Sequence, residues 1–132
     1  MTAFEQIGSG LATADLAVAR AIGIIVAFTH RAEAPVNISC QLVEETSGND
    51  EPQRGRFLQW TNLKLVIPVQ SGITRDLDAT RQAIIGGDKI EYPLGSGRLF
   101  YVMPDELKKI HNGYSYLCVA RSEKTLTLGP KS

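Results

Sequence analysis

The sequence has no excess of charge of either sign, and this narrows the classes of partner. Its 132 residues include 14 lysines and arginines and 14 aspartates and glutamates, so the formal net charge at pH 7 is zero. Nucleic acids and anionic membranes capture proteins through clustered positive charge, which this balance does not favour. We therefore expect protein partners. A near-neutral chain also lacks the self-repulsion that opposes dense self-association.

Histidine and cysteine are scarce, which leaves little material for catalysis or metal binding. Cys40 and Cys118 lie in alternating apolar runs, a pattern that predicts buried thiols rather than ligands or a disulfide. Neither has a neighbour at the spacing of a metal site. His30 ends an apolar run with no acid nearby in the sequence, so we expect a solvated strand-edge residue. His111 lies in a turn, where a surface ring is expected.

Recognisable catalytic motifs are also absent. The chain has no glycine-rich phosphate loop between a strand and a helix, and no serine or cysteine nucleophile in a known turn. Trp60 and Tyr114 have few basic neighbours, unlike the aromatics of barrels that bind single-stranded nucleic acid. Asp76 and Asp78 are interpreted as capping carboxylates. We predict a protein without enzymatic activity, cofactor or bound metal.

No apolar run has the length or the flanks of a membrane or export segment. The run at 22–28 is too short to span a bilayer. It follows an acidic residue and an arginine, and no small-residue cleavage site comes after it. We expect neither a signal peptide nor a membrane span, and we expect the chain to be cytosolic when it is made.

What the sequence does contain is one helix pattern followed by many short strand patterns. The length suits a single domain, residues 1–132. A helix is expected at about 11–22, capped by Thr13 and ended by Gly23, after a loose N-terminal segment. Short alternating runs over about 23–128 then predict a mainly β fold. We expect a small antiparallel β-barrel or sandwich of about six or seven strands.

The stretch at 84–102 has the clearest pattern. Two isoleucines lead into a Gly-Gly-Asp turn, an alternating strand follows as far as Pro93, and residues 99–102 return after a turn with two glycines. Residues 104–110 begin with proline and two acids and end near lysines, which predicts a short helical turn. Residues 114–121 and 125–128 are expected as separate strands, whereas 73–85 fits either a short helix or an extended connection.

Shared parity within each strand predicts the residues of the core. They are Ile24, Val26, Ile38, Cys40, Leu63, Leu65, Ile67, Ile90, Tyr92, Phe100, Val102, Leu117 and Val119. The long strand at 56–70 contains Pro68, which cannot donate a ladder hydrogen bond. An edge or a bulge is therefore expected at that end of the strand.

The segment at 44–56 contains no hydrophobic residue and is predicted to be one long mobile loop. It is either a solvated hairpin loop or an arm that orders against a partner, and the pattern favours the two equally. Its acidic residues precede its basic ones, so neighbouring copies could pair them. The candidate interface residues are Glu44, Glu45, Asp50, Glu51, Arg54 and Arg56. Asp50 and Glu51 lack the ligand pattern of a cation site.

Gly87-Asp88 forms a turn before a hairpin, and Tyr101-Val102 lies within that hairpin. With the order of elements, these points resemble the head-tail joining or head-closure (neck connector) family of tailed bacteriophages, and expected synthesis is then in the host cytoplasm. This resemblance implies a structural protein of the virion neck, which forms a homo-oligomeric ring and contacts portal or adaptor and tail proteins. It implies no specific nucleic-acid or membrane binding. Two alternatives stay open: a tail-completion or tail-terminator ring protein, and a monomeric barrel that binds a small ligand or acts as an enzyme.

Overall fold

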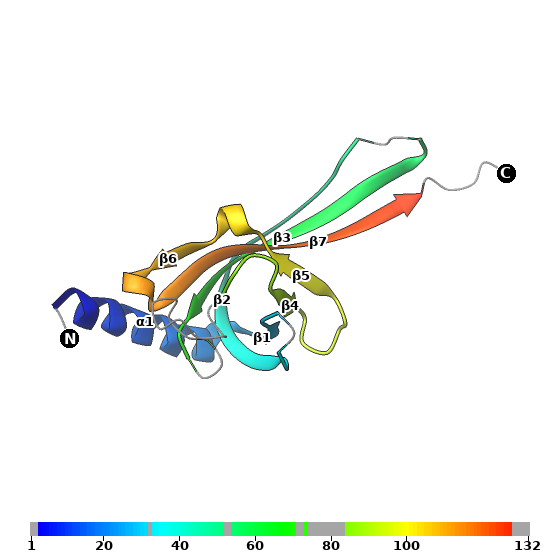
Figure 1. Cartoon of the computed structure of the whole chain (residues 1–132). Helices are drawn as coiled ribbons and strands as arrows, with labels where there is room; N and C mark the ends of the chain where they lie inside the picture. The colour runs from blue at the N-terminus through cyan, green and yellow to red at the C-terminus, as the bar shows by residue number, and fades with distance from the viewer. Residues whose placement is uncertain (1–2, 32, 52–53, 71–72, 74–83, 128–132) are drawn as a thin grey trace.

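The chain folds into a mainly β structure preceded by one helix (Figure 1). The computed structural model describes residues 3–31, 33–51, 54–70, 73 and 84–127, of which 3–5 and 127 are described by their backbone alone. Six antiparallel strands close into a barrel, and a seventh lies beside it. The predicted fold class is therefore confirmed.

The barrel closes because the strand at one end of the sheet order, residues 56–68, also pairs with the strand at residues 115–127. The sheet order is β3-β2-β1-β4-β5-β7-β6, and an additional pairing joins β3 to β7. In the described part of the chain the elements are α1 (Ala3–Ile22), β1 (Ile24–Thr29), β2 (Val36–Asn49), β3 (Arg56–Pro68), β4 (Lys89–Glu91), β5 (Leu99–Val102), η2 (Pro104–Glu106), β6 (Lys108–Ile110), η3 (His111–Gly113) and β7 (Ser115–Thr127).

Helix α1 begins earlier than predicted. Thr13, expected as its N-cap, lies inside the helix, and its hydroxyl donates to the carbonyl of Ser9 at 2.9 Å. Gly8 allows the added turns to dock, because a Cβ there would overlap the carbonyl group of His111 in η3. The end of the helix was predicted correctly, since the Gly23 amide donates to the Ala19 carbonyl at 2.9 Å.

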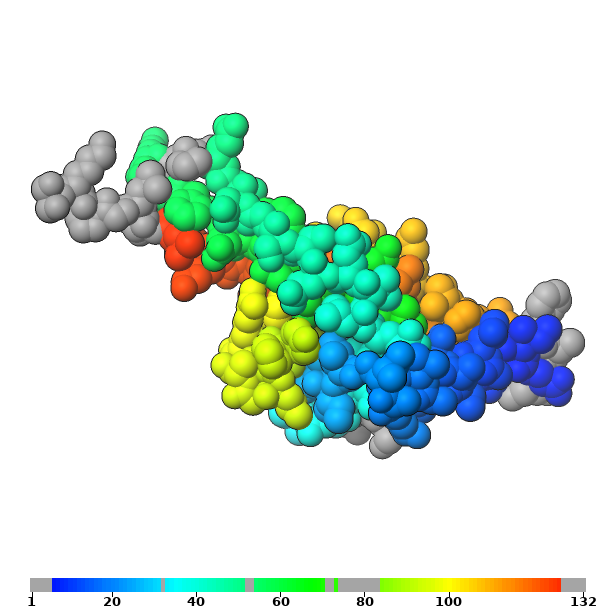
Figure 2. Space-filling view, turned by 180° about the vertical axis from the view of Figure 1, so that it is seen from behind, coloured from blue at the N-terminus to red at the C-terminus, as the bar shows by residue number. Residues whose placement is uncertain are grey.

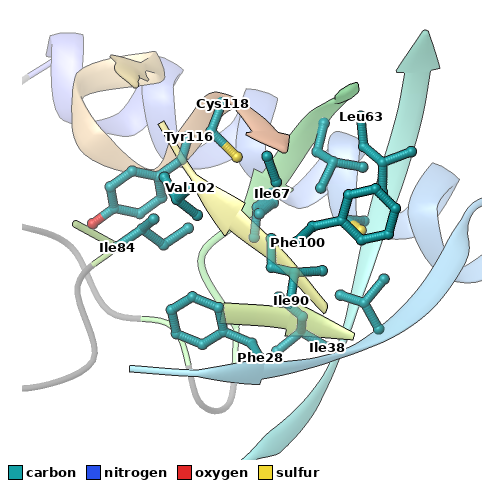
Figure 3. Close-up of a cluster of buried hydrophobic side chains, with 14 of the residues drawn as sticks. Phe28, Ile38, Leu63, Ile67, Ile84, Ile90, Phe100, Val102, Tyr116 and Cys118 are labelled. Atoms are coloured by element: carbon teal, nitrogen blue, oxygen red, sulfur yellow. The ribbon is translucent and has the colours of Figure 1, made fainter. Parts of the chain in front are cut away.

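The core fills the barrel interior (Figure 3). Most of the predicted core residues are buried, whereas Ile24 and Tyr92 are half-buried and pack against the cluster. Leu117 and Val119 were assigned to the wrong face of β7: the buried residues of that strand include Tyr116, Cys118 and Ala120. The pairing with β3 decides this, because Cys118 lies opposite the buried Leu65, and directly paired residues share a face.

Pro68 marks the end of a strand pairing. The pairing of β2 with β3 stops at Gln41 and Val66, two residues short of Ser39 and Pro68. The Gln70 side chain completes the ladder there: its Oε1 accepts from the Ser39 amide at 2.9 Å, and its Nε2 donates to the Ser39 carbonyl at 2.8 Å. A side-chain amide thus supplies the donor that proline lacks.

The hairpin at 84–102 is confirmed, with β4 and β5 paired through Ile90 and Phe100. Two neighbouring predictions were wrong. The helical turn predicted at 104–110 ends at Glu106, and Lys108–Ile110 forms β6 against β7. The connection predicted at 122–124 is continuous strand, because β3 supplies pairing partners as far as Thr127. Of the segment 73–85, residues 74–83 lie outside the described residues, and Asp76 and Asp78 with them.

Candidate functional site: the projecting arm

The region 44–56 is not one long loop. Residues 44–49 continue β2 and pair with β3, from Glu44 opposite Lys64 to Asn49 opposite Gln59. The Asp50 amide donates to the Leu58 carbonyl at 2.8 Å, so the connection is shorter than predicted. The sequence pattern was misleading because a two-stranded ladder satisfies backbone groups without needing apolar side chains. Mobility of the shorter connection stays a prediction.

A three-stranded arm extends beyond the barrel (Figure 1). We define the arm as residues 43–49 of β2, 56–62 of β3 and 121–127 of β7. It projects because β1 pairs with β2 only up to Cys40, and β5 pairs with β7 only at Ala120 and Arg121. Beyond these points no strand of the described chain covers the outer edge of β2 or of β7. The arm therefore ends in two open edges.

One face of the arm is held together by the contacts of Trp60 and Arg121. Trp60 covers Gly48 on the neighbouring strand, where a Cβ would collide with the indole ring. The Arg121 guanidinium lies 4.8 Å from the centre of that ring, and its Nε donates to Asn62 Oδ1 at 3.1 Å. A large ring over a cross-strand glycine stabilises isolated strands. The arm is thus built as a sheet in its own right.

The six predicted interface residues all lie on the hairpin of the arm and are all exposed. Glu44 and Glu45 belong to β2, Arg56 begins β3, and the other three lie in the connection. No ion pair joins any two of the six within the described part of the chain. Sequence reasoning placed all six charges in one loop but missed that strands carry three of them, Glu44 and Glu45 on β2 and Arg56 on β3.

An open cleft of about 610 Å³ lies between the arm and the β4–β5 connection. Its lining includes Gln59, Thr61, Arg98, Tyr101, Ser122 and Lys124. The Arg98 side chain is held at one side of the cleft by two contacts. Its Nη2 donates to Thr61 Oγ1 at 2.8 Å, and its guanidinium lies 5.0 Å from the centre of the Phe100 ring. The lining also includes Glu123, so charged side chains of both signs line the cleft together with neutral polar ones.

The prediction for His30 was wrong, because the ring is buried. Its Nδ1 lies 2.9 Å from Oδ2 of Asp88, which is also buried. The same carboxylate accepts from the amides of Ile85 at 2.9 Å and Arg31 at 3.3 Å. Asp88 therefore ties the end of β1 to the turn that precedes β4. Both partners are enclosed and neither lines the cleft, so the pair is a structural clamp.

The second histidine and the two cysteines all lie at least partly inside the fold. His111 is half-buried rather than a free surface ring, and its Nε2 lies 3.0 Å from Asp15 Oδ2 on α1. Cys40 and Cys118 are free and buried, as predicted. Burial, with a smaller contribution from nearby Cys118, raises the pKa of Cys40 to about 12; burial also raises the pKa of Cys118 to about 12. Both thiols are thus protonated and unreactive at neutral pH.

Neither a metal centre nor a membrane helix is found in the part of the chain that the structure describes. No group of three or more histidine, cysteine, aspartate or glutamate side chains there is arranged to hold an ion. None of the described helices combines the length and apolarity needed to cross a bilayer. The arm, with its open edges, and the adjoining cleft are the candidate functional surfaces.

No protein-family model matches the chain, and no curated protein matches it significantly.

Proposed function

We propose that the protein is a structural component of a tailed-phage neck, where its copies assemble into a ring through the arm. The observation that carries the assembly step is the arm itself, which projects from the barrel with two open edges. The resemblance of Gly87-Asp88 and Tyr101-Val102 to the neck connector family supplies the place of assembly. The balanced charge and the scarcity of catalytic groups are compatible with a structural role.

Open strand edges favour pairing with another strand. An exposed edge presents a row of free backbone donors and acceptors, which a second chain can extend by strand addition. If the β2 edge of one copy meets the β7 edge of the next, the contact is head-to-tail, and such contacts form a ring when the rotation from copy to copy closes on itself. The arm provides both edges on one molecule, so each copy can have two neighbours.

Charge on one face of the arm suits this contact. Glu45 on β2 and Lys124 on β7 lie on the same face, because Glu45 pairs with Leu63, Lys124 pairs with Gln59, and strand residues two or four apart share a face. The two residues lie four positions apart along the arm, so a β2–β7 contact between copies staggered by about 13 Å would place the glutamate of one beside the lysine of the next. Such a pair gives orientation more than affinity, and salt would weaken it where it is exposed.

The test is a charge swap on the arm. We expect the wild-type protein to form rings in light scattering and electron microscopy, and Glu45→Lys or Lys124→Glu alone to weaken them. An equimolar mixture of the two variants, or the double variant, should recover assembly because the opposite charges meet again. The matched control is Asp105→Lys, an equal charge change at an exposed site on η2.

Two results would contradict the proposal. A wild-type protein that stays monomeric at all concentrations and does not purify with phage particles would remove the ring. Single variants that assemble as well as the Asp105→Lys control would remove the arm from the contact. A monomer whose melting temperature rises with a small polar ligand would instead favour the cleft as the functional site.

A further inference from the structure

The outward face of α1 is apolar along its whole described length. Its large exposed side chains are Ile7 at 62%, Leu11 at 46%, Val18 at 42% and Ile22 at 83% relative exposure. The other exposed positions from 6 to 22 are glycine or alanine, except Gln6, Thr13 and Arg20. A helix that faces water on one side normally carries charged residues there. This face has a single charge and is built like a buried one.

The helix packs on the barrel through small residues. Gly8, Ala12 and Ala19 are the buried positions of α1, and Gly8 touches the backbone of η3. A helix that serves only its own core would bury its large residues and expose its small ones. Here the order is reversed, so the large side chains are available for a second contact. Figure 2 shows the helix (blue) with no coloured segment lying over it in that view.

The order of the outward residues is symmetric about the middle of the helix. Ile7 and Ile22 lie at equal distances from the midpoint between positions 14 and 15, and so do Leu11 and Val18. In an antiparallel pair of identical helices, each isoleucine would therefore meet the other isoleucine, and each leucine a valine. This self-complementary order is what a two-fold contact between identical chains requires.

We propose that the outward face of α1 pairs with the same face of a second copy, in an antiparallel two-fold contact. Gly10, Ala14, Ala17 and Ala21 form a parallel row of small residues that allows the two helices to approach closely. An antiparallel pair also separates the two Arg20 side chains, which a parallel in-register pair would bring together. Helix dipoles favour the same orientation. This contact is separate from the arm and does not rest on the ring proposal.

Cysteine cross-linking tests the contact and its direction. We expect mild oxidation to link Leu11→Cys protein to Val18→Cys protein in a mixture, because the two positions face each other. Leu11→Cys alone should not cross-link, since the two copies of position 11 would be about 10 Å apart along the helix axis, beyond disulfide reach. Cys40 and Cys118 are buried and should not interfere.

Charge substitutions test the same contact without cross-linking. Leu11→Glu or Val18→Glu should weaken dimerisation at least tenfold in sedimentation, because each inserts a charge into the apolar face. Thr13→Glu, on the polar line of Gln6, Thr13 and Arg20, is the matched control and should leave dimers intact. Circular dichroism should show that all three variants remain folded, since these positions are exposed.

The cross-linking results distinguish the antiparallel α1 pair from a parallel pair and from no pair, and they are independent of the ring proposed for the arm. Cross-linking of Leu11→Cys with itself would show a parallel pair and overturn the proposed orientation. Absence of any cross-link, together with a monomeric wild type, would overturn the pairing itself, and binding of α1 to a different neck protein would then explain the face. The arm variant Glu45→Lys should still give the Leu11–Val18 cross-link in a Cys background, so failure of the ring leaves this test valid.

Discussion

At the scale of single residues, the buried His30–Asp88 pair joins two distant segments of the barrel. The carboxylate accepts three hydrogen bonds, from the His30 ring and from the amides of Arg31 and Ile85. It joins two segments 58 positions apart in the chain. Buried polar groups are tolerated when they are bonded in this way and are costly when one partner is removed.

We predict that Asp88→Ala lowers the free energy of unfolding by about 3–5 kcal/mol, because it leaves buried donors without an acceptor. Urea unfolding followed by fluorescence measures this. Asp15→Ala is the control, since Asp15 also contacts a histidine but is half-buried. Its loss should be about 1 kcal/mol or less. Equal losses in the two variants would show that Asp88 is not a clamp.

At the scale of elements, close approach decides how α1 docks. Gly8 faces the carbonyl of His111, while a Cβ at Gly10 would meet nothing within 4 Å. The two glycines are one half-turn apart and differ only in which side of the helix they occupy. In β7, likewise, contact with another element decides which side is buried, because its pairing with β3 sets the face.

This difference predicts opposite effects of the same substitution. Gly10→Ala should stabilise the protein by roughly 0.5–1 kcal/mol, because alanine loses less backbone entropy in a helix. Gly8→Ala should destabilise it and loosen α1 from η3, because the added methyl group meets backbone. Thermal unfolding and hydrogen exchange of the 111–113 amides would measure both. A stabilising Gly8→Ala would disprove the docking geometry.

At the scale of the whole molecule, the chain divides into a closed barrel that holds the core and an arm that adds none of it. The core cluster lies in the barrel strands and their connections, and its members on β3 begin at Leu63. The arm is instead held by its ladder and by the contacts of Trp60 and Arg121. Stability and assembly should therefore be separable properties.

Replacing residues 48–60 with an Asn-Gly turn should leave the barrel folded and abolish ring formation. The reason is that the turn rejoins Ser47 to its partner Thr61 and keeps every core residue. Leu65→Ala is the contrasting variant, because Leu65 is fully buried, and its loss should cost about 2–5 kcal/mol. A truncated protein that unfolds as readily as Leu65→Ala would show that the arm is part of the folding unit.

The sequence by itself determined the local features of this protein. Alternation of apolar residues placed the strands, Gly23 ended the helix, and the glycines after Pro93 made the β4–β5 turn. These features depend on backbone geometry and on the period of nearby side chains, which a short stretch of sequence contains. The burial of Cys40 followed from the same periodicity, whereas the core parity assigned to Leu117 and Val119 placed Cys118 on the opposite face.

Only the tertiary structure decided which segments meet. His30 was expected in solvent because its partner lies on a distant turn, and the pairing of β1 with β4 brings Asp88 beside it. The face of β7 and the strand character of 44–49 both depend on β3, whose pairing extends well past the barrel. Long-range strand pairing selects among local patterns that are equally allowed, because each strand has two faces and either can be buried.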